Sequence, residues 1–322
     1  MRSTMMGAVK RGRKMRVEGL CRLSRIARTA ALLVLGLLAG CGALGTNDRY
    51  SLGNTQVVNY RTHDPVRDYK LYVSLPRNYE ARASERFPVI FLLDADYSFA
   101  ITRNLVRHFT DRGQAQESII VGVAYPDADD DMDVYHRTRT RDYTPSFTLE
   151  NGYGPEIQKL SGGAPVFLKL LADEVLPEID RRYRTQPHER MLVGNSFGGI
   201  FAVYALLTRP DLFERFLIVS PSLWYDNKMI FSVAQRFIAM HHELPVKVFY
   251  AVGSEENTPP PEGSAMVDDL KSFVALMNAG NLAGYDASLT IFDGETHNSV
   301  FPAAVSRGLR VLYGFKGEKA AK

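Results

Sequence analysis

The segment 191–199 constrains the fold of this 322-residue chain more than any other stretch of its sequence. It places the spacing Gly194-x-Ser196-x-Gly198 directly after the apolar run Met-Leu-Val and directly before the apolar segment 200–207. The first run is typical of a short buried strand, and the second has the composition of a helix. A serine at so tight a strand-to-helix turn has the geometry of a nucleophile elbow, because glycine neighbours allow close backbone approach. The alternative is a glycine-rich turn with no catalytic role. A catalytic serine would need a histidine and an acid elsewhere in the chain, so their presence distinguishes the two interpretations.

The first 40 residues have the composition of an export signal rather than of a folded domain. They contain nine Lys or Arg and one acid, and they end in the apolar run Ala30–Ala39. Such a run is too short to span a membrane as a stable helix, and basic residues before it are typical of a cleaved signal.

The end of this signal indicates a lipid anchor. Leu38-Ala39-Gly40-Cys41 resembles the lipobox of bacterial lipoproteins, in which the cysteine is acylated and becomes the mature N-terminus. An ordinary signal with a chance cysteine is the alternative. By the same resemblance, the glycine at position 42 favours sorting to an outer membrane. We therefore expect an exported chain that is anchored through Cys41 to a bacterial outer membrane, faces the periplasm, and has 41–50 as its tether.

The charge and cysteine content of the remaining chain exclude two classes of function. Residues 1–40 carry nine of the 39 basic and one of the 36 acidic residues, so the rest has 30 basic and 35 acidic residues, a net charge of −5. A nucleic-acid-binding protein would need a basic face. Cys21 and Cys41 are the only cysteines, so the exported domain has no disulfide and no thiol for catalysis or metal binding. Residues 51–322 are long enough for a single catalytic domain.

Apolar runs divide this domain into strands and helices. Two segments, 55–60 and 69–75, alternate apolar and polar residues and predict half-exposed antiparallel strands at a sheet edge. The runs 88–93 and 118–124 are continuously apolar, as expected of parallel strands buried on both faces, and 101–110 predicts the helix between them. The same alternation continues through later strands (216–220, 245–252, 287–292) and helices (166–183, 232–240, 299–313). The pattern predicts an α/β fold with a mostly parallel central sheet and helices on both faces.

An insertion, about 125–164, interrupts this alternation, and we expect it to lie as a loop over the active site. Its acidic run 127–133 fits no EF-hand spacing, so we expect no metal there. An arginine-rich stretch follows, in which Arg137, Arg139 and Arg141 are candidates for binding an anionic substrate. The alternative is that Arg141 and Asp142 form a structural pair that anchors the insertion.

Two later loops offer the partners that a reactive serine needs. A serine hydroxyl becomes nucleophilic when an imidazole accepts its proton and a carboxylate orients that imidazole. In α/β-hydrolases the order along the chain is serine, acid, histidine. His297 follows the last predicted strand and is the candidate base, and Glu256 is the preferred acid, with its neighbour Glu255 as the alternative.

The remaining candidates stabilise the reaction or shape the pocket. An oxyanion hole needs two backbone N–H donors, for which we expect Phe197 and either Ala95 or Asp96, in the loop after the strand 88–93. Trp224 and Tyr225 follow another central strand and are candidates for lining the substrate pocket, although ordinary packing would explain them equally well.

Six sequence blocks, taken in order, resemble the esterase D-type family of α/β-hydrolases. They are the strand and loop 88–96, Arg-Asp-Tyr-Thr-Pro (141–145), Gly-Gly-Ala-x-x-Phe (162–167), Gly-Asn-Ser-Phe-Gly-Gly (194–199), Ser-Pro-Ser-Leu-Trp (220–224) and Gly-Ser-Glu-Glu (253–256). Blocks 141–145 and 220–224 are similar to the branch of siderophore trilactone esterases, which act on enterobactin, salmochelin and bacillibactin. Asn195 departs from the family, where histidine is commoner, and so does Ala95, where glycine is usual.

The resemblance implies an α/β-hydrolase fold and hydrolysis of carboxylic esters through an acyl-enzyme, without a cofactor. Some members of the branch work with serine and histidine alone, so the role of either glutamate stays open. The sequence thus predicts a lipid-anchored serine esterase for a small-molecule ester, with siderophore lactones as candidate substrates. An acyltransferase with the same residues is the first alternative, and a non-catalytic binding lipoprotein is the second.

Overall fold

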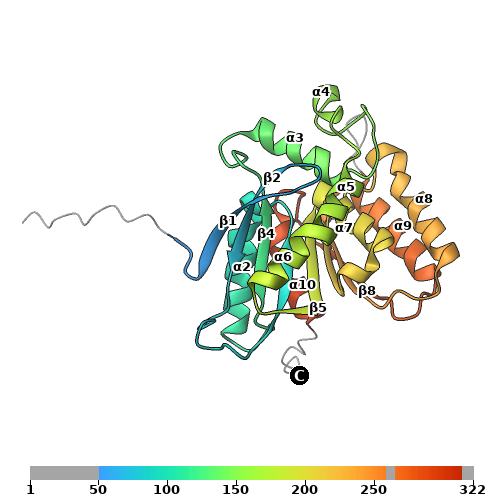
Figure 1. Cartoon of the computed structure of the whole chain (residues 1–322). Helices are drawn as coiled ribbons and strands as arrows, with labels where there is room; N and C mark the ends of the chain where they lie inside the picture. The colour runs from blue at the N-terminus through green and yellow to red at the C-terminus, as the bar shows by residue number, and fades with distance from the viewer. Residues whose placement is uncertain (1–50, 259–264, 314–322) are drawn as a thin grey trace, which may run out of the picture. The chain divides into compact units, whose positions relative to one another are not determined.

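An eight-stranded mixed sheet organises the part of the chain that the structure describes (Figure 1). The structure is a computed structural model that describes residues 51–258 and 265–313. The predicted signal, Cys41 and the tether lie outside the described residues. From Leu52 onward the chain forms one compact unit.

The order of the strands is β1-β2-β4-β3-β5-β6-β7-β8. The edge strand β1 is antiparallel to β2, and β2 is antiparallel to β4, whereas β4, β3 and β5 to β8 run parallel to one another. The sequence placed β2 at a sheet edge, but it lies one strand inside. Every residue of β3 and β4 is buried, while exposed and half-buried residues alternate along β1, so the patterns in the sequence predicted both kinds of strand correctly. The strands are β1 (Thr55–Arg61), β2 (Asp68–Ser74), β3 (Phe87–Leu92), β4 (Ile119–Ala124), β5 (Thr185–Asn195), β6 (Arg215–Val219), β7 (Lys247–Gly253) and β8 (Asp286–Phe292).

Helices cover both faces of the sheet and bury a separate apolar cluster on each. One cluster joins α2 (Ala95–Thr110) and α10 (Val300–Leu312) to the sheet. The larger cluster joins α5 (Ala164–Leu170), α6 (Leu176–Arg182), α7 (Phe197–Thr208), α8 (Tyr225–Met240) and α9 (Met266–Ala279) to the other face. A π-helical turn, Leu171–Val175, makes α5 and α6 continuous. The predicted α/β fold with helices on both faces is confirmed.

The insertion differs from the predicted loop because its arginine-rich stretch is a helix, α3 (Met132–Tyr143), followed by the short α4 (Pro155–Gln158). The side chain of Asp131, within the acidic run, caps α3 by accepting hydrogen bonds from the N–H groups of Asp133 and Val134. The helix lacks a continuous apolar stripe, which is why its sequence suggested a loop. Both helices lie at the top of the view in Figure 1, above the carboxyl ends of the parallel strands.

The base of the insertion is fixed by the buried carboxylate of Asp142. It accepts hydrogen bonds from Arg67 Nη1 at 2.7 Å and from the Tyr69 hydroxyl at 2.9 Å, which both lie in or beside β2. Arg141 adds a bidentate pair at 2.7 and 2.8 Å. These contacts tie the end of α3 to the edge of the sheet.

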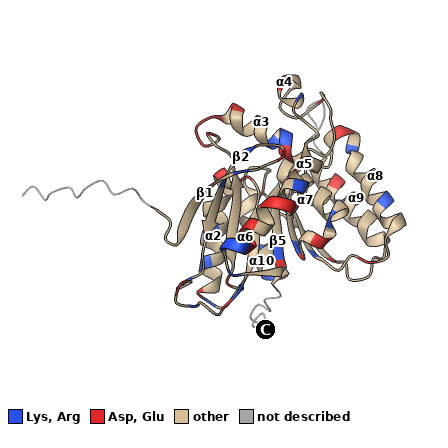
Figure 2. Ribbon diagram, in the orientation of Figure 1, with Lys and Arg blue, Asp and Glu red and all other residues tan. Residues whose placement is uncertain are grey.

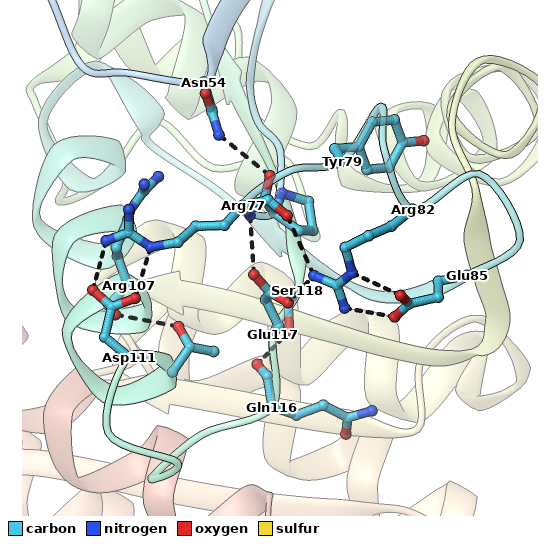
Figure 3. A network of polar contacts seen from close by, with 12 residues as sticks. Asn54, Arg77, Tyr79, Arg82, Glu85, Arg107, Asp111, Gln116, Glu117 and Ser118 are labelled. Carbon is cyan, nitrogen blue, oxygen red and sulfur yellow. Dashed lines mark hydrogen bonds and ion pairs between the residues drawn. The ribbon is translucent and has the colours of Figure 1, made fainter.

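A second polar network lies at the opposite, amino end of the parallel strands (Figure 3). Arg77 donates two hydrogen bonds to Asp111 at 2.8 and 2.7 Å, and Arg82 pairs with both Glu85 and Glu117. Elsewhere, as Figure 2 shows, acidic and basic residues lie close together on α3 and α6, where i,i+3 and i,i+4 pairs form.

Candidate active site

Ser196 stands at a backbone turn that its glycine neighbours make feasible. Its φ of 58° and ψ of −117° lie outside the regions that a non-glycine residue ordinarily adopts. A Cβ at Gly194 would lie 2.1 Å from the carbonyl oxygen of Gly198, and one at Gly199 would lie 2.8 Å from Pro221 Cα. Glycine is therefore required at both positions. The turn places Ser196 directly before the first turn of α7, where the helix dipole favours developing negative charge.

His297 and Glu256 form a close pair beside this turn. His297 Nδ1 lies 2.7 Å from Glu256 Oε2, and the other carboxylate oxygen accepts from Ser220 Oγ at 2.6 Å and from the Gly253 N–H at 2.7 Å. Because an ionised carboxylate can only accept, His297 Nδ1 donates and Nε2 is left as a proton acceptor. The Glu256 side chain is 1% exposed whereas that of His297 is 37% exposed, so the acid is enclosed and the base is accessible.

The loops that carry the acid and the base are themselves joined. The Glu255 N–H donates to the carbonyl oxygen of Glu295 at 3.0 Å, and the Gly294 N–H donates to Ser254 Oγ at 2.9 Å. A Cβ at Gly253 would lie 2.2 Å from the Glu295 carbonyl oxygen, so glycine allows this approach. The Glu255 side chain accepts from Ser254 instead of meeting the imidazole. Of the two candidate glutamates, Glu256 is therefore the one in contact with His297.

The predicted oxyanion donors occupy the starts of two helices that lie on opposite faces of the sheet. Phe197 is the first residue of α7, and Ala95 and Asp96 are the first two of α2. The first N–H groups of a helix have no acceptor within it and point along the positive end of its dipole. A Cβ at Gly198 would lie 3.0 Å from Asp94 Oδ2, which brings the loop before α2 against the first turn of α7.

The unusual alanine of the predicted oxyanion loop has a local explanation in β4. The side chain of Ala95 is buried, and a Cβ at Gly122 would lie only 2.6 Å from the Ala95 Cβ. Glycine at position 122 leaves the room that the extra methyl group needs.

Two cavities meet at the serine and the histidine. The larger has a volume of about 800 Å³ and is lined by Ser196, His297, Trp224, Lys228 and other residues. The smaller, of about 310 Å³, is lined by Ser196 and His297 together with an aromatic and basic wall, formed by Tyr97, Tyr135, Arg139, Tyr153 and Phe301. A substrate group could thus lie on either side of the candidate nucleophile.

Residues 62–310 match the model of the family described as "Putative esterase". This chain belongs to that esterase family. The match spans the sheet from β2 to β8, the insertion, and both loops of the His297–Glu256 pair.

Curated relatives confirm the resemblance to the siderophore branch. The chain is 29% identical over 274 residues to the ferri-bacillibactin esterase BesA of Bacillus subtilis (strain 168), covering 83% of this chain and 92% of that one. It is also 29% identical over 282 residues to the siderophore triacetylfusarinine C esterase of Aspergillus fumigatus, covering 79% and 91%. Among solved structures, the IroE-like serine hydrolase of Shewanella oneidensis superimposes with a TM-score of 0.71 at 27% identity, covering 81% and 80%. The fold is that of an α/β-hydrolase.

The residues predicted to bind substrate have different surroundings in the esterase. Trp224 lines the larger cavity. Tyr225 is fully buried, donates from its hydroxyl to the Ser146 carbonyl oxygen at 2.9 Å, and packs edge-on against Phe197 at 5.6 Å. The Arg141 guanidinium is paired with Asp142, which is the structural alternative named above. Neither Tyr225 nor Arg141 is among the described residues that line the two cavities.

Sequence reasoning missed part of the site. Ser220 holds the acid, and Ser222 Oγ lies 3.4 Å from Ser196 Oγ. Both belong to the block 220–224, whose position after a central strand was the available signal. Asp94 was not among the candidates, and Arg139 was named only for binding an anionic substrate. The two form a buried ion pair at 3.0 and 3.1 Å, a contact between residues 45 positions apart that has no local sequence signal.

The carboxylate of Asp96 is the most perturbed acid near the elbow. Burial, together with the nearby charges of Asp129 and Asp94, raises the pKa of Asp96 to about 7. Backbone hydrogen bonds from Asp96 and Tyr125 lower the pKa and offset part of this rise. Among the described residues, we find no group of three or more metal-binding side chains, and no helix long and apolar enough to cross a membrane.

Proposed function

We propose that this protein is a serine esterase that cleaves carboxylic esters through an acyl-enzyme, with Ser196 as nucleophile, His297 as base and Glu256 as the orienting acid. The observation that carries the proposal is the 2.7 Å contact between His297 Nδ1 and the buried Glu256 carboxylate, on a loop that shares both cavities with Ser196. This arrangement presents the acceptor nitrogen of the imidazole to the site.

In the first half of the reaction, Ser196 Oγ attacks the ester carbonyl carbon while His297 Nε2 takes the hydroxyl proton. Negative charge forms on the carbonyl oxygen, where the N–H groups of Phe197 and of Ala95 or Asp96 stabilise it. The imidazolium then gives its proton to the leaving alcohol, and the acyl group stays on Ser196. The Glu256 carboxylate stabilises the imidazolium and holds its ring.

In the second half, water replaces the alcohol. His297 accepts a proton from the water as its oxygen attacks the acyl carbon. The bond to Ser196 Oγ then breaks, the proton returns to Ser196, and the carboxylic acid leaves. The 37% exposure of the His297 side chain is consistent with entry of water on this side.

We propose siderophore esters as the substrate class. Support comes from the relatives, which are named as esterases of ferri-bacillibactin and of triacetylfusarinine C and span nearly all of the domain. The larger cavity, of about 800 Å³, has room for a sizeable ester next to the nucleophile.

The assignment is tested by comparing wild-type protein with Ser196→Ala on p-nitrophenyl butyrate. We expect hydrolysis by the wild type and a loss of at least about a thousandfold in kcat for the variant, because nothing else supplies the nucleophile. Full activity of Ser196→Ala would contradict the mechanism. Adding sugar acceptors and identifying the products by mass distinguishes hydrolysis from acyl transfer.

The substrate class needs a separate comparison. Ferric and iron-free trilactones are compared with simple acyl and feruloyl esters, and the products are identified by mass spectrometry. We expect higher kcat/KM for the lactones. If no lactone is cleaved while butyrate is, the siderophore proposal fails and the esterase proposal stands.

We further propose that the enzyme works at a bacterial membrane, anchored through a lipid on Cys41. The basic and apolar signal and the Leu-Ala-Gly-Cys sequence before position 42 support this. Expression of the full chain and of Cys41→Ser should give membrane-bound and released protein, respectively. Equal release of both would contradict the anchor.

A further inference from the structure

A buried ion pair joins the insertion to the loop that precedes α2. Arg139 Nε and Nη2 donate to the two carboxylate oxygens of Asp94 at 3.0 and 3.1 Å. The side chains are 3% and 1% exposed. Arg139 comes from α3, in the middle of the insertion, whereas Asp94 directly follows the β3 strand region and caps α2. The pair is therefore the direct charged link between the two segments.

The guanidinium of Arg139 lies at the wall of the active site. It lines the smaller cavity together with Ser196 and His297. Its carbon lies 5.3 Å from the centre of the Phe197 ring, and its third nitrogen donates to the Tyr153 hydroxyl. All three of its nitrogens thus have partners within the protein, so the side chain is held in place rather than offered to a substrate.

The backbone of Asp94 is held by hydrogen bonds directly before the residues predicted to supply the second oxyanion donor. Asp94 has φ 51° and ψ 47°, a left-handed conformation that costs a non-glycine residue free energy. Its N–H donates to the Tyr143 hydroxyl at 3.2 Å, and its carbonyl oxygen accepts from the Ser98 N–H at 3.1 Å. The next two residues, Ala95 and Asp96, are the candidates for the second oxyanion donor.

The negative charge of Asp94 lies close to the proposed site of the oxyanion. A Cβ at Gly198 would be 3.0 Å from Asp94 Oδ2, so the carboxylate abuts the first turn of α7. An unpaired negative charge there would oppose the negative charge that develops on the substrate. Burial disfavours the charged form of Arg139, but the charge of Asp94 outweighs this effect and raises the pKa of Arg139 well above its usual value. The positive partner therefore stays charged.

We propose that Arg139 is a positioning residue of the esterase reaction: through Asp94 it fixes the loop that supplies the second oxyanion donor and neutralises the carboxylate beside it. The inference rests on the proposed function of Ser196. It predicts that the pair acts on the transition state more than on substrate binding, because the oxyanion forms only as the reaction proceeds.

The test compares Asp94→Asn, Arg139→Met and the double variant Asp94→Asn/Arg139→Met with the wild type in the full-length protein, because asparagine tolerates the left-handed backbone at position 94. Each single variant leaves one buried polar partner unmatched, whereas the double variant removes both charges, so its melting temperature should recover toward the wild type. We expect kcat on p-nitrophenyl butyrate to fall about a hundredfold in all three with KM within about threefold, because displacement of a catalytic group by 1 Å can cost this much.

Asp142→Asn is the matched control, because it removes another buried acid that pairs with arginine on the same helix. Asp142 contacts Arg67, Tyr69 and Arg141 and lies outside the oxyanion loop. We expect it to lower the melting temperature while kcat stays within about threefold of the wild type.

Two results would overturn the proposal. One is a kcat for Asp94→Asn within about threefold of the wild type, and the other is recovery of kcat together with the melting temperature in the double variant. In both cases the wild type still cleaves the ester. If the proposed function were wrong, the wild type itself would not cleave it, so the two failures can be distinguished.

Discussion

The two ends of the parallel sheet both carry arginine–carboxylate pairs, but in opposite surroundings. At the amino end, Arg77 and Asp111 form a bidentate pair with side chains that are 52% and 37% exposed (Figure 3). At the carboxyl end, Arg139 and Asp94 form a pair of the same geometry with side chains that are 3% and 1% exposed.

The comparison shows how burial changes the contribution of an arginine–carboxylate pair to stability. An exposed pair is screened by water and contributes little to stability. A buried pair has lost its hydration, so removal of one partner leaves a charge that nothing compensates. Such enclosed charges lie around the proposed active site, since Glu256 is also buried and hydrogen-bonded through both carboxylate oxygens.

Among the buried charges, the largest expected effect on turnover concerns the acid of the site. Glu256→Gln should lower kcat/KM on p-nitrophenyl butyrate by about a hundredfold or more, because an amide cannot stabilise the imidazolium and can hold the wrong tautomer. Its neighbour supplies the control: Glu255→Gln should stay within about threefold, since that side chain contacts Ser254 rather than His297. Equal kcat/KM for Glu256→Gln and wild type would mean that serine and histidine suffice.

The next effect compares the two ends directly by urea denaturation. Arg139→Met should lower the free energy of unfolding by about 3–5 kcal/mol, because it leaves the Asp94 carboxylate buried and unpaired. Arg77→Met removes a pair of the same geometry and should leave the denaturation midpoint unchanged within error. A similar decrease in the free energy of unfolding in both variants would show that burial does not determine how much these pairs contribute to stability.

The smallest effect is a pH dependence set by Asp96. With its pKa raised to about 7, the folded protein keeps this proton over a range in which the unfolded chain has lost it. Stability should therefore fall as the pH rises from about 4 to about 7, and Asp96→Asn should remove this loss. Above pH 7 we expect the variant to be more stable by about 1–2 kcal/mol, a value reduced for partial solvent screening.

The pH prediction is checked by urea denaturation of both proteins at pH 5 and pH 8. A stability difference between wild type and Asp96→Asn that does not change with pH would contradict the raised pKa.

The sheet and the elbow were predictable because their signals are local. Strands buried on both faces read as continuous apolar runs, and the glycines around Ser196 mark the turn that they make feasible. The order of serine, acid and histidine located both loops. It did not separate Glu255 from Glu256, because adjacent residues follow the same strand and only the backbone of Ser254–Glu256 decides which one faces His297.

The insertion was the less predictable part. Arg137, Arg139 and Arg141 look like one basic stretch, but on a helix residues two positions apart point in different directions. Arg137 is exposed and pairs with Asp133, whereas Arg139 is buried against Asp94. That second contact spans 45 positions and depends on how α3 packs over the sheet, which no local pattern encodes.

The most direct measurement of the central claim is the intact mass of the protein mixed rapidly with a p-nitrophenyl ester and quenched in acid. We predict a species heavier by one acyl group, with the modified peptide containing Ser196 and no such species in Ser196→Ala. An acyl group on another residue, or steady turnover by Ser196→Ala, would contradict the assignment of Ser196 as the nucleophile.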